Sequence, residues 1–176
     1  MKRLIRSILV EFMAVGLVGL VAGPSAAQTP AASASEPQLT LSGDVPRPLV
    51  VTASELKAMT RTTVTVSAEG RRNTYEGVLV GHLLQRAGAP LGGEFRGEAL
   101  ATYVLATAKD GYRVLYSLGE LDPALTPNDI LVADTIDGQP LADNQGPFRI
   151  VAPRDSRAVR GVRMLQRLDV VTVRPK

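Results

Sequence analysis

The segment with the strongest chemical character is NQGPFRIVAPRDSR, residues 144–157, in which three arginines lie beside a Gly-Pro pair and a second proline. A guanidinium group can pair with phosphate or carboxylate through two parallel hydrogen bonds. Two interpretations are open from the residues alone: an anion-binding surface, or a solvated charged edge that balances an acidic remainder. The arginines that could form one basic surface are Arg149, Arg154, Arg157, Arg160, Arg163 and Arg167.

The charge of the chain is unevenly placed. Residues 28–142 hold nine basic and thirteen acidic side chains, a net charge of −4, whereas residues 143–176 hold eight basic and three acidic ones, a net charge of +5. An anion would therefore be attracted to the C-terminal fifth. Five arginines, from Arg154 to Arg167, also have the spacing of one helical face, although Gly161 interrupts it.

Other kinds of catalysis have few candidate residues. The chain has no cysteine and one histidine, His82, which we expect on the outer or rim side of a helix and not as a general base. Without thiolates, and with Met59 and Met164 as the thioethers beyond the leader, zinc and haem lack ligands. Neither a nucleophile elbow nor a Walker or Rossmann glycine pattern is present.

Residues 1–27 have the pattern of a secretory signal peptide. Basic residues precede the apolar run 8–22, and small residues end at Ala27, where we expect cleavage; a retained membrane anchor is the alternative. Residues 28–37 are predicted to be a disordered spacer, and residues 38–176 to be one domain. We therefore expect a periplasmic or secreted protein with no stable membrane span after cleavage.

Nucleic acid is not an expected partner. Cleavage after Ala27 removes three basic groups and one acid, so the formal net charge falls from +3 to +1. The basic segment also has almost no aromatic residues on which bases could stack. The expected partners are instead a small anionic ligand or a periplasmic protein.

Strand patterns dominate the domain. We expect strands over residues 39–43, 62–68, 101–108, 112–118 and 130–136, with two more in FRIVAP and RLDVVTV, and hairpin turns at Asp110-Gly111 and Asp137-Gly138. A helix is predicted after Thr52, which forms a capping box with Glu55, and a second over 80–87 with Gly88 as its stop. The expected fold class is α+β, a largely β domain with a mixed sheet or partly closed barrel and a few short helices, in all seven or eight strands.

Five segments in this order resemble the oxidoreductase molybdopterin-binding domain, the catalytic domain of sulfite-oxidase-like enzymes, and in particular its short exported stand-alone versions. The resemblance covers residues 38–174, and no single motif in it is diagnostic. The segments are LSGDVPRPLVVTASELKAM, TYEGVLVGHLLQRAG, ATYVLATAKDGYRVLYSLGEL, DILVADTIDGQPL and NQGPFRIVAPRDSRAVRGVRMLQRLDV.

The resemblance implies a mixed α+β fold and a set of cofactor-binding residues. In the family, arginines, a lysine and backbone amides hold the pterin, and one cysteine ligates molybdenum. The resemblance implies that Arg149 points into a preformed anion pocket, with Arg154 and Arg157 at its mouth. The residues that it assigns to cofactor binding are Tyr75, Gly146, Pro147, Arg149, Arg154 and Arg163.

The departures from the family pattern bear on catalysis. The ligating cysteine is expected within residues 65–73, which contain none; Ser67 is the one hydroxyl we considered there as a replacement ligand. Gln145 stands where catalytic members often have a histidine, and Arg154 replaces a glycine. We therefore expect no catalytic residues and no metal site, and as cofactor either none or molybdopterin.

Three functions remain in competition at this stage. The first is a non-redox or degenerate binding module for a small anionic ligand or a protein partner. The second is a molybdenum-dependent periplasmic oxidoreductase with a non-cysteine ligand. The third is a structural or interaction domain whose arginines contact an acidic partner surface. Whether the protein is an enzyme is left open by the sequence, and the missing cysteine favours a non-enzymatic role.

Overall fold

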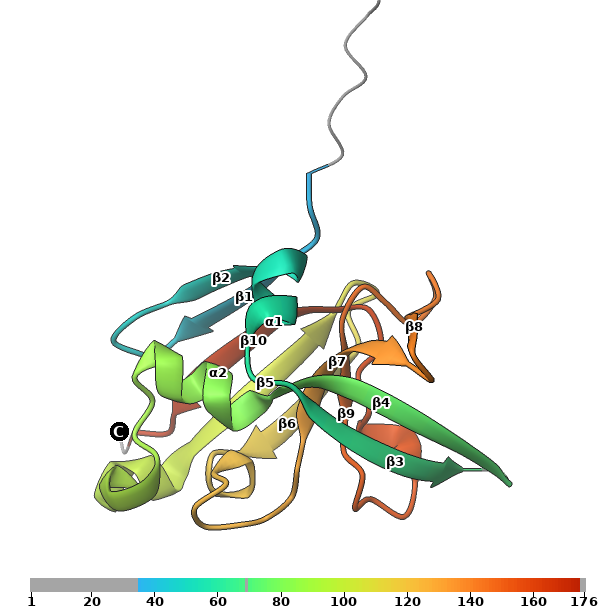
Figure 1. Cartoon of the computed structure of the whole chain (residues 1–176). Coiled ribbons are helices and arrows are strands. Elements are labelled where there is room, and N and C mark those ends of the chain that lie inside the picture. The colour runs from blue at the N-terminus through green and yellow to red at the C-terminus, as the bar shows by residue number, and fades with distance from the viewer. Residues whose placement is uncertain (1–34, 69, 175–176) are drawn as a thin grey trace, which may run out of the picture. The chain divides into compact units, whose positions relative to one another are not determined.

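The computed structural model describes residues 35–68 and 70–174, and within them the chain forms two five-stranded sheets (Figure 1). The first sheet has the order β2-β1-β10-β5-β6; the second has the order β3-β4-β7-β8, with β9 also paired to β7. The strands are β1 (Gln38–Gly43), β2 (Leu49–Thr52), β3 (Thr62–Ala68), β4 (Arg71–Leu79), β5 (Thr102–Ala108), β6 (Arg113–Ser117), β7 (Leu131–Ile136), β8 (Gln139–Pro140), β9 (Arg149–Val151) and β10 (Leu165–Thr172).

The expected fold class is confirmed. β1 and β10 pair in parallel and their other neighbours pair antiparallel, so the first sheet is mixed. The number of strands is ten where seven or eight were expected. The main omission is β4, which begins with the polar residues Arg71-Arg72-Asn73 and therefore lacks an apolar alternation where it starts.

The core lies between the first sheet, the helices and the inner face of the second sheet. Val104 and Val170 of the first sheet, Leu84 of helix α2, and Val132 and Ile150 of the second sheet are all fully buried in one cluster. The other face of the first sheet carries exposed side chains such as Leu115, which is 53% exposed. The helical turns are α1 (Ala53–Ala58), α2 (Val80–Ala87), and the 3-10 turns η1 (Gly92–Glu94), η2 (Gly97–Ala101), η3 (Gly119–Leu121) and η4 (Ala158–Arg160).

Both predicted helices and both predicted hairpins are present. Thr52 accepts from the amide of Glu55, and the Glu55 carboxylate accepts from the amide of Thr52, which completes the capping box of α1. Helix α2 ends at Gly88, whose left-handed conformation (φ 81°) favours glycine. The turns at 109–111 and 137–138 connect β5 to β6 and β7 to β8.

The helical spacing noted for the C-terminal arginines does not correspond to a helix, and the strand predicted in RLDVVTV is present as β10. Only Ala158–Arg160 form a turn, and β10 begins at Leu165. Val162 pairs through its backbone with Ile150, and Leu165, Leu168 and Val170 are buried on one strand. Tertiary pairing with β1 and β5 decides the backbone here, because the apolar residues have no helical stripe to bury.

The N-terminal predictions fall mostly outside the described residues, which include no part of the proposed signal peptide. Of the predicted spacer, Glu36 accepts from the Ser54 amide at 2.6 Å and the Pro37 carbonyl accepts from the Ala53 amide at 3.0 Å. These contacts attach the start of β1 to α1. Among the helices of the described region, none has the length and apolar character needed to span a bilayer.

Candidate functional site

Arg149, the first residue of β9, is held by side chains from two other segments. Its Nη1 donates to the hydroxyl of Tyr75 on β4 at 3.1 Å and to Oε1 of Gln145. Its guanidinium carbon lies 5.1 Å from the centroid of the Tyr75 ring. Since β9 and β4 both flank β7, the register of the second sheet brings these distant residues together.

The remaining donors of Arg149 have no hydrogen-bond partner among the described residues. Nε is buried and makes no hydrogen bond, and no carboxylate among the described residues lies within ion-pair distance of this guanidinium. Burial lowers the pKa of Arg149, and the nearby charge of Arg163 lowers that pKa further. A partly buried cation without a counter-ion costs free energy, which a bound anion would recover.

Beside Arg149 is a cavity of about 430 Å³. We call it the Arg149 cavity. It has two cationic side chains, Arg149 and Arg163, and one acidic one, Asp110. Its other lining residues are Tyr112, Gln145, Ala158, Val159 and Gly161. The combination of two guanidinium groups, an amide and an apolar rim suits an anion that also carries an apolar body.

Gly161 keeps space open next to the guanidinium. A Cβ atom at this position would lie 3.7 Å from Nη2 of Arg149 and 3.3 Å from the carbonyl oxygens of Ala158 and Ile150. The Nε and Nη2 atoms form the edge of a guanidinium group that can bind a carboxylate or phosphate through two parallel hydrogen bonds. A side chain at residue 161 would therefore crowd the edge that has no protein partner.

The outer wall of the Arg149 cavity is fastened to β6 and η3. The Tyr112 hydroxyl donates to the Val159 carbonyl at 2.5 Å, and the Tyr116 hydroxyl donates to the Arg160 carbonyl. Arg160 makes a bidentate pair with Asp155 at 2.8 Å and reaches Glu120 at 2.9 Å. Arg160 is thus a structural clamp and has no free donor edge for a ligand.

The structure separates the predicted site residues into three groups. Arg149 and Arg163 line the Arg149 cavity, and Tyr75 contacts Arg149 without lining the cavity itself. Gly146 and Pro147, joined by a cis peptide bond, line a different and larger cavity. Arg154 lines neither cavity, and Arg157, expected at the mouth, is also absent from both linings. His82 is half-buried on α2 and lines neither cavity.

Gln145, Tyr112 and Gly161 are among the six lining residues of the Arg149 cavity that were not assigned to binding from the sequence. Gln145 was noted as a departure from the family pattern, Tyr112 is the first residue of a predicted strand, and Gly161 was noted as an interruption of the helical spacing. The position of Gln145 four residues before Arg149 was a usable signal, since both side chains flank the same Gly-Pro turn. Tyr112 and Gly161 gave no such signal, because their roles depend on contacts between segments far apart in the chain.

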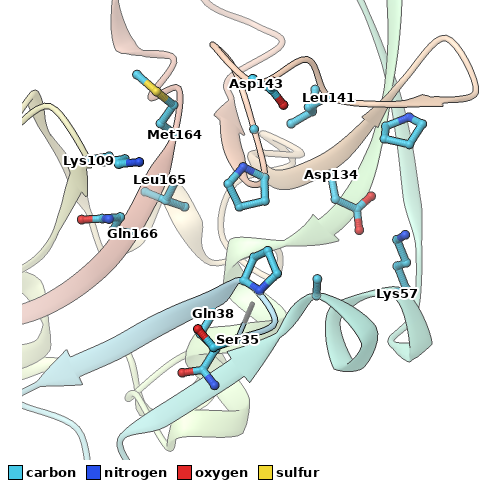
Figure 2. A pocket seen from close by; sticks show the side chains of 15 residues that line it. Ser35, Gln38, Lys57, Lys109, Asp134, Leu141, Asp143, Met164, Leu165 and Gln166 are labelled. Atoms are coloured by element: carbon cyan, nitrogen blue, oxygen red, sulfur yellow. The ribbon is translucent and has the colours of Figure 1, made fainter. Parts of the chain in front are cut away.

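The larger cavity has a volume of about 790 Å³ and opens between α1, the start of β10 and the segment that follows β7 (Figure 2). We call it the Lys57–Lys109 cavity. Figure 2 shows Lys57 on the side of Asp134, and Lys109 on the side of Met164 and Gln166. Three pairs of adjacent residues, 109–110, 145–146 and 163–164, each contribute one residue to each cavity. The two cavities are therefore neighbours, and these three segments lie between them.

No metal centre is formed by the described residues. They contain no group of three histidine, cysteine, aspartate or glutamate side chains that could hold an ion. Ser67, the hydroxyl considered as a replacement ligand, is exposed near the end of β3 and pairs with Arg72 in the ladder. It lines neither of the two cavities.

Comparisons with known proteins identify the fold and the family. The model of the oxidoreductase molybdopterin binding domain matches residues 26–176. A solved structure, the sulfane dehydrogenase SoxCD from Paracoccus pantotrophus, is similar with a TM-score of 0.61 and 21% identity; the match covers 76% of this chain and 38% of that one. No curated protein matches the chain. The likeness to SoxCD shows the fold. The matched region is well under half the length of the SoxCD chain.

Proposed function

Since the chain belongs to the oxidoreductase molybdopterin binding domain family, we propose that it is a non-redox member that binds an anionic ligand in the Arg149 cavity. The observation that carries the proposal is the buried, unpartnered Nε of Arg149 beside a second arginine. An uncompensated cation in a preformed cavity is expensive unless an anion accompanies it. The arrangement is therefore suited to binding.

The residues of this site fit the phosphate of molybdopterin and do not fit its metal. Arg149 and Arg163 are suited to its phosphate, because guanidinium groups form paired hydrogen bonds with phosphate oxygens. When bound with molybdenum, this cofactor supplies two-electron redox chemistry at the metal. The chain has no cysteine to ligate that metal. The residues present thus favour a pterin or a smaller anion held by its charged group.

The chain's own residues explain how such an anion would be bound. Tyr75 and Gln145 occupy Nη1 of Arg149 and so fix the plane of the guanidinium before a ligand arrives. Nη2 on the side of Gly161 then donates to the anion, and Arg163 adds a second positive charge. Because the side chain is already ordered, little conformational entropy is lost on binding.

The direct test combines composition with titration. Protein purified from its native host is assayed for molybdenum by mass spectrometry and for pterin by fluorescence after oxidation. The proposal predicts substoichiometric molybdenum and binding of inorganic phosphate or a pterin phosphate that Arg149→Gln abolishes. Phosphate affinity that is equal in wild type and Arg149→Gln would overturn the proposal. The arginines would then be tested for contact with a partner protein, through the salt dependence of that binding.

Molybdenum-dependent oxidoreductase activity is the competing function, and family membership is its support. It predicts stoichiometric molybdenum, and loss of the metal in Ser67→Ala if that serine is the ligand. The exposure of Ser67 argues against this role. Retention of full molybdenum content in Ser67→Ala would require a different ligand, and absence of molybdenum from wild type purified under the same conditions would reject the function.

We also propose that the protein is exported by the signal peptide predicted over residues 1–27. Its support is the basic, apolar and small-residue pattern of that segment. N-terminal sequencing of the protein from the periplasm or culture medium should begin at Gln28. A chain that retains Met1 and sediments with membranes would instead support the retained anchor.

A further inference from the structure

The Lys57–Lys109 cavity has a distribution of basic residues unlike that of the remaining surface. Lys57 and Lys109 are the only lysines between residues 35 and 174, a range that holds fourteen arginines. Both lysines line this cavity, and no arginine does. They come from α1 and from the turn between β5 and β6, so the tertiary structure brings them to one cavity. Figure 2 shows them on opposite sides of it.

Neither lysine has an acidic partner. No carboxylate of the described residues lies within ion-pair distance of either ammonium group. Asp134, which lies on the Lys57 side, is 6% exposed and already forms a bidentate pair with Arg61 at 3.0 and 2.5 Å. Asp143 is exposed at the rim. Among the lining side chains, the charged groups outside an ion pair are therefore two exposed ammonium groups and the exposed Asp143 carboxylate, and the Glu36 carboxylate lies close enough to interact electrostatically with Lys57.

Apolar side chains separate the two lysines. Leu165 is 1% exposed and Leu141 is 9% exposed, and both contribute to the lining. Met164 lies on the Lys109 side and has a left-handed backbone (φ 49°), which non-glycine residues rarely adopt. Its backbone is held by Gln145 and Lys109, at 2.9 Å each. The other apolar lining residues are Pro37, Ala53, Pro140 and Pro147.

From this arrangement we propose that the Lys57–Lys109 cavity is a second ligand site, for an elongated organic dianion of the dicarboxylate class. One carboxylate would lie against Lys57 and the other against Lys109, with an apolar chain along Leu141, Leu165 and Met164. Ammonium groups suit such a ligand because they act as compact point charges that do not require a planar fork geometry. The proposal does not depend on the Arg149 cavity.

The test uses the mature protein and a series of straight-chain dicarboxylates from succinate to dodecanedioate. Amine acylation followed by mass spectrometry reports each lysine separately, and Lys176 near the chain end serves as the internal reference. We expect one member of intermediate length to protect both Lys57 and Lys109 while leaving Lys176 reactive. The matching monocarboxylate should protect less, because only one ammonium group can be paired at a time.

Substitution of each lysine tests its contribution to the dicarboxylate affinity. Lys57→Gln and Lys109→Gln should each weaken binding of the best dicarboxylate about fivefold, the effect of one partly solvated ion pair. Lys57→Arg should retain most of the affinity. The matched control is Arg113→Gln, which removes an exposed positive charge from β6 and should leave the affinity unchanged.

Two results would overturn the proposal. One is that no member of the series protects both lysines. The other is that Arg113→Gln weakens dicarboxylate binding as much as the lysine variants do, which would reduce the effect to general electrostatic attraction. A dicarboxylate affinity lost in Arg149→Gln and kept in the lysine variants would reassign the ligand to the Arg149 cavity.

Discussion

Tyr75 and Arg149 are 74 residues apart in sequence and are joined by a hydrogen bond between the Tyr75 hydroxyl and Nη1 of Arg149, 3.1 Å long. This contact uses one end of the guanidinium and leaves the buried Nε without a partner. The geometry orients a cation toward the cavity without neutralising it. Four predictions follow from this relationship and from the wall that closes the cavity.

Replacement of Arg149 by methionine should stabilise the protein in the absence of anions and abolish anion binding. Methionine keeps much of the side-chain volume and removes a partly buried charge that has no counter-ion, so the gain should be about 1 kcal/mol. Thermal unfolding in a buffer of low anion content should show a Tm higher by about 2–4 °C. Added phosphate should raise the Tm of wild type and leave that of Arg149→Met unchanged. A lower Tm for the variant without anions would contradict the uncompensated charge.

Substitution of Gly161 by alanine should weaken anion binding. The new methyl group would lie 3.7 Å from Nη2 of Arg149, on the edge that we assign to the ligand. We expect about a tenfold loss of phosphate affinity, equivalent to about 1.4 kcal/mol. Gly93→Ala is the matched control, because a Cβ there meets open space. Equal phosphate affinities for Gly161→Ala and Gly93→Ala would exclude the fork edge as the binding surface.

Removal of the Tyr116 hydroxyl should destabilise the wall of the Arg149 cavity. In Tyr116→Phe the Arg160 carbonyl loses its donor, and an unsatisfied buried acceptor costs about 1–2 kcal/mol. Urea denaturation measures this change in the free energy of unfolding. Tyr103→Phe provides the comparison, because the half-buried Tyr103 has no side-chain hydrogen bond to the described residues. We expect it to lie within about 0.5 kcal/mol of wild type, and an equal loss in both variants would rule out a specific role for the Tyr116 bond.

The stability of the protein should fall at alkaline pH in a way that depends on Tyr116. Burial raises the pKa of its hydroxyl far above the ordinary value of 10, with further increases from Asp155 and Glu120 that Arg160 opposes. Above pH 10 the unfolded chain releases this proton while the folded chain retains it. The contribution of Tyr116 to the free energy of unfolding is therefore complete below pH 10. It is lost as the pH rises toward the pKa of Tyr116 in the folded protein, at up to about 1.4 kcal/mol per pH unit. The slope of unfolding free energy against pH above 10 should be shallower in Tyr116→Phe than in wild type, and parallel curves would refute the shift.

Much of the local structure could be predicted from the chain. Strand β3 has the predicted bounds, and the capping box of Thr52 and Glu55 forms as expected, because alternation and capping depend on residues close in sequence. Strand β4 was missed because Arg71, Arg72 and Asn73 begin it without an apolar pattern. Its position is set by pairing with β3 and β7, which no local pattern encodes.

The candidate site could be predicted only in part. Arg149, Arg163 and Tyr75 were named; the two arginines line one cavity, and Tyr75 contacts Arg149. Gly146 and Pro147 were placed with them, although these residues line the other cavity. Within five residues, from Gln145 to Arg149, the chain contributes to both cavities, and sequence motifs do not specify which side of a segment faces which space.

The sequence by itself determined the short-range elements, the absence of a cysteine ligand and the excess of arginine near the C-terminus. Only the tertiary structure decided which half-buried arginine of the described residues lacks an acidic partner. Arg160 is neutralised by Asp155 and Glu120, and Arg167 by Asp169, whereas Arg149 meets a phenol and an amide. These guanidinium groups are chemically identical, and their charges differ in effect because Coulomb energy and desolvation depend on distances that arise only after distant strands pair.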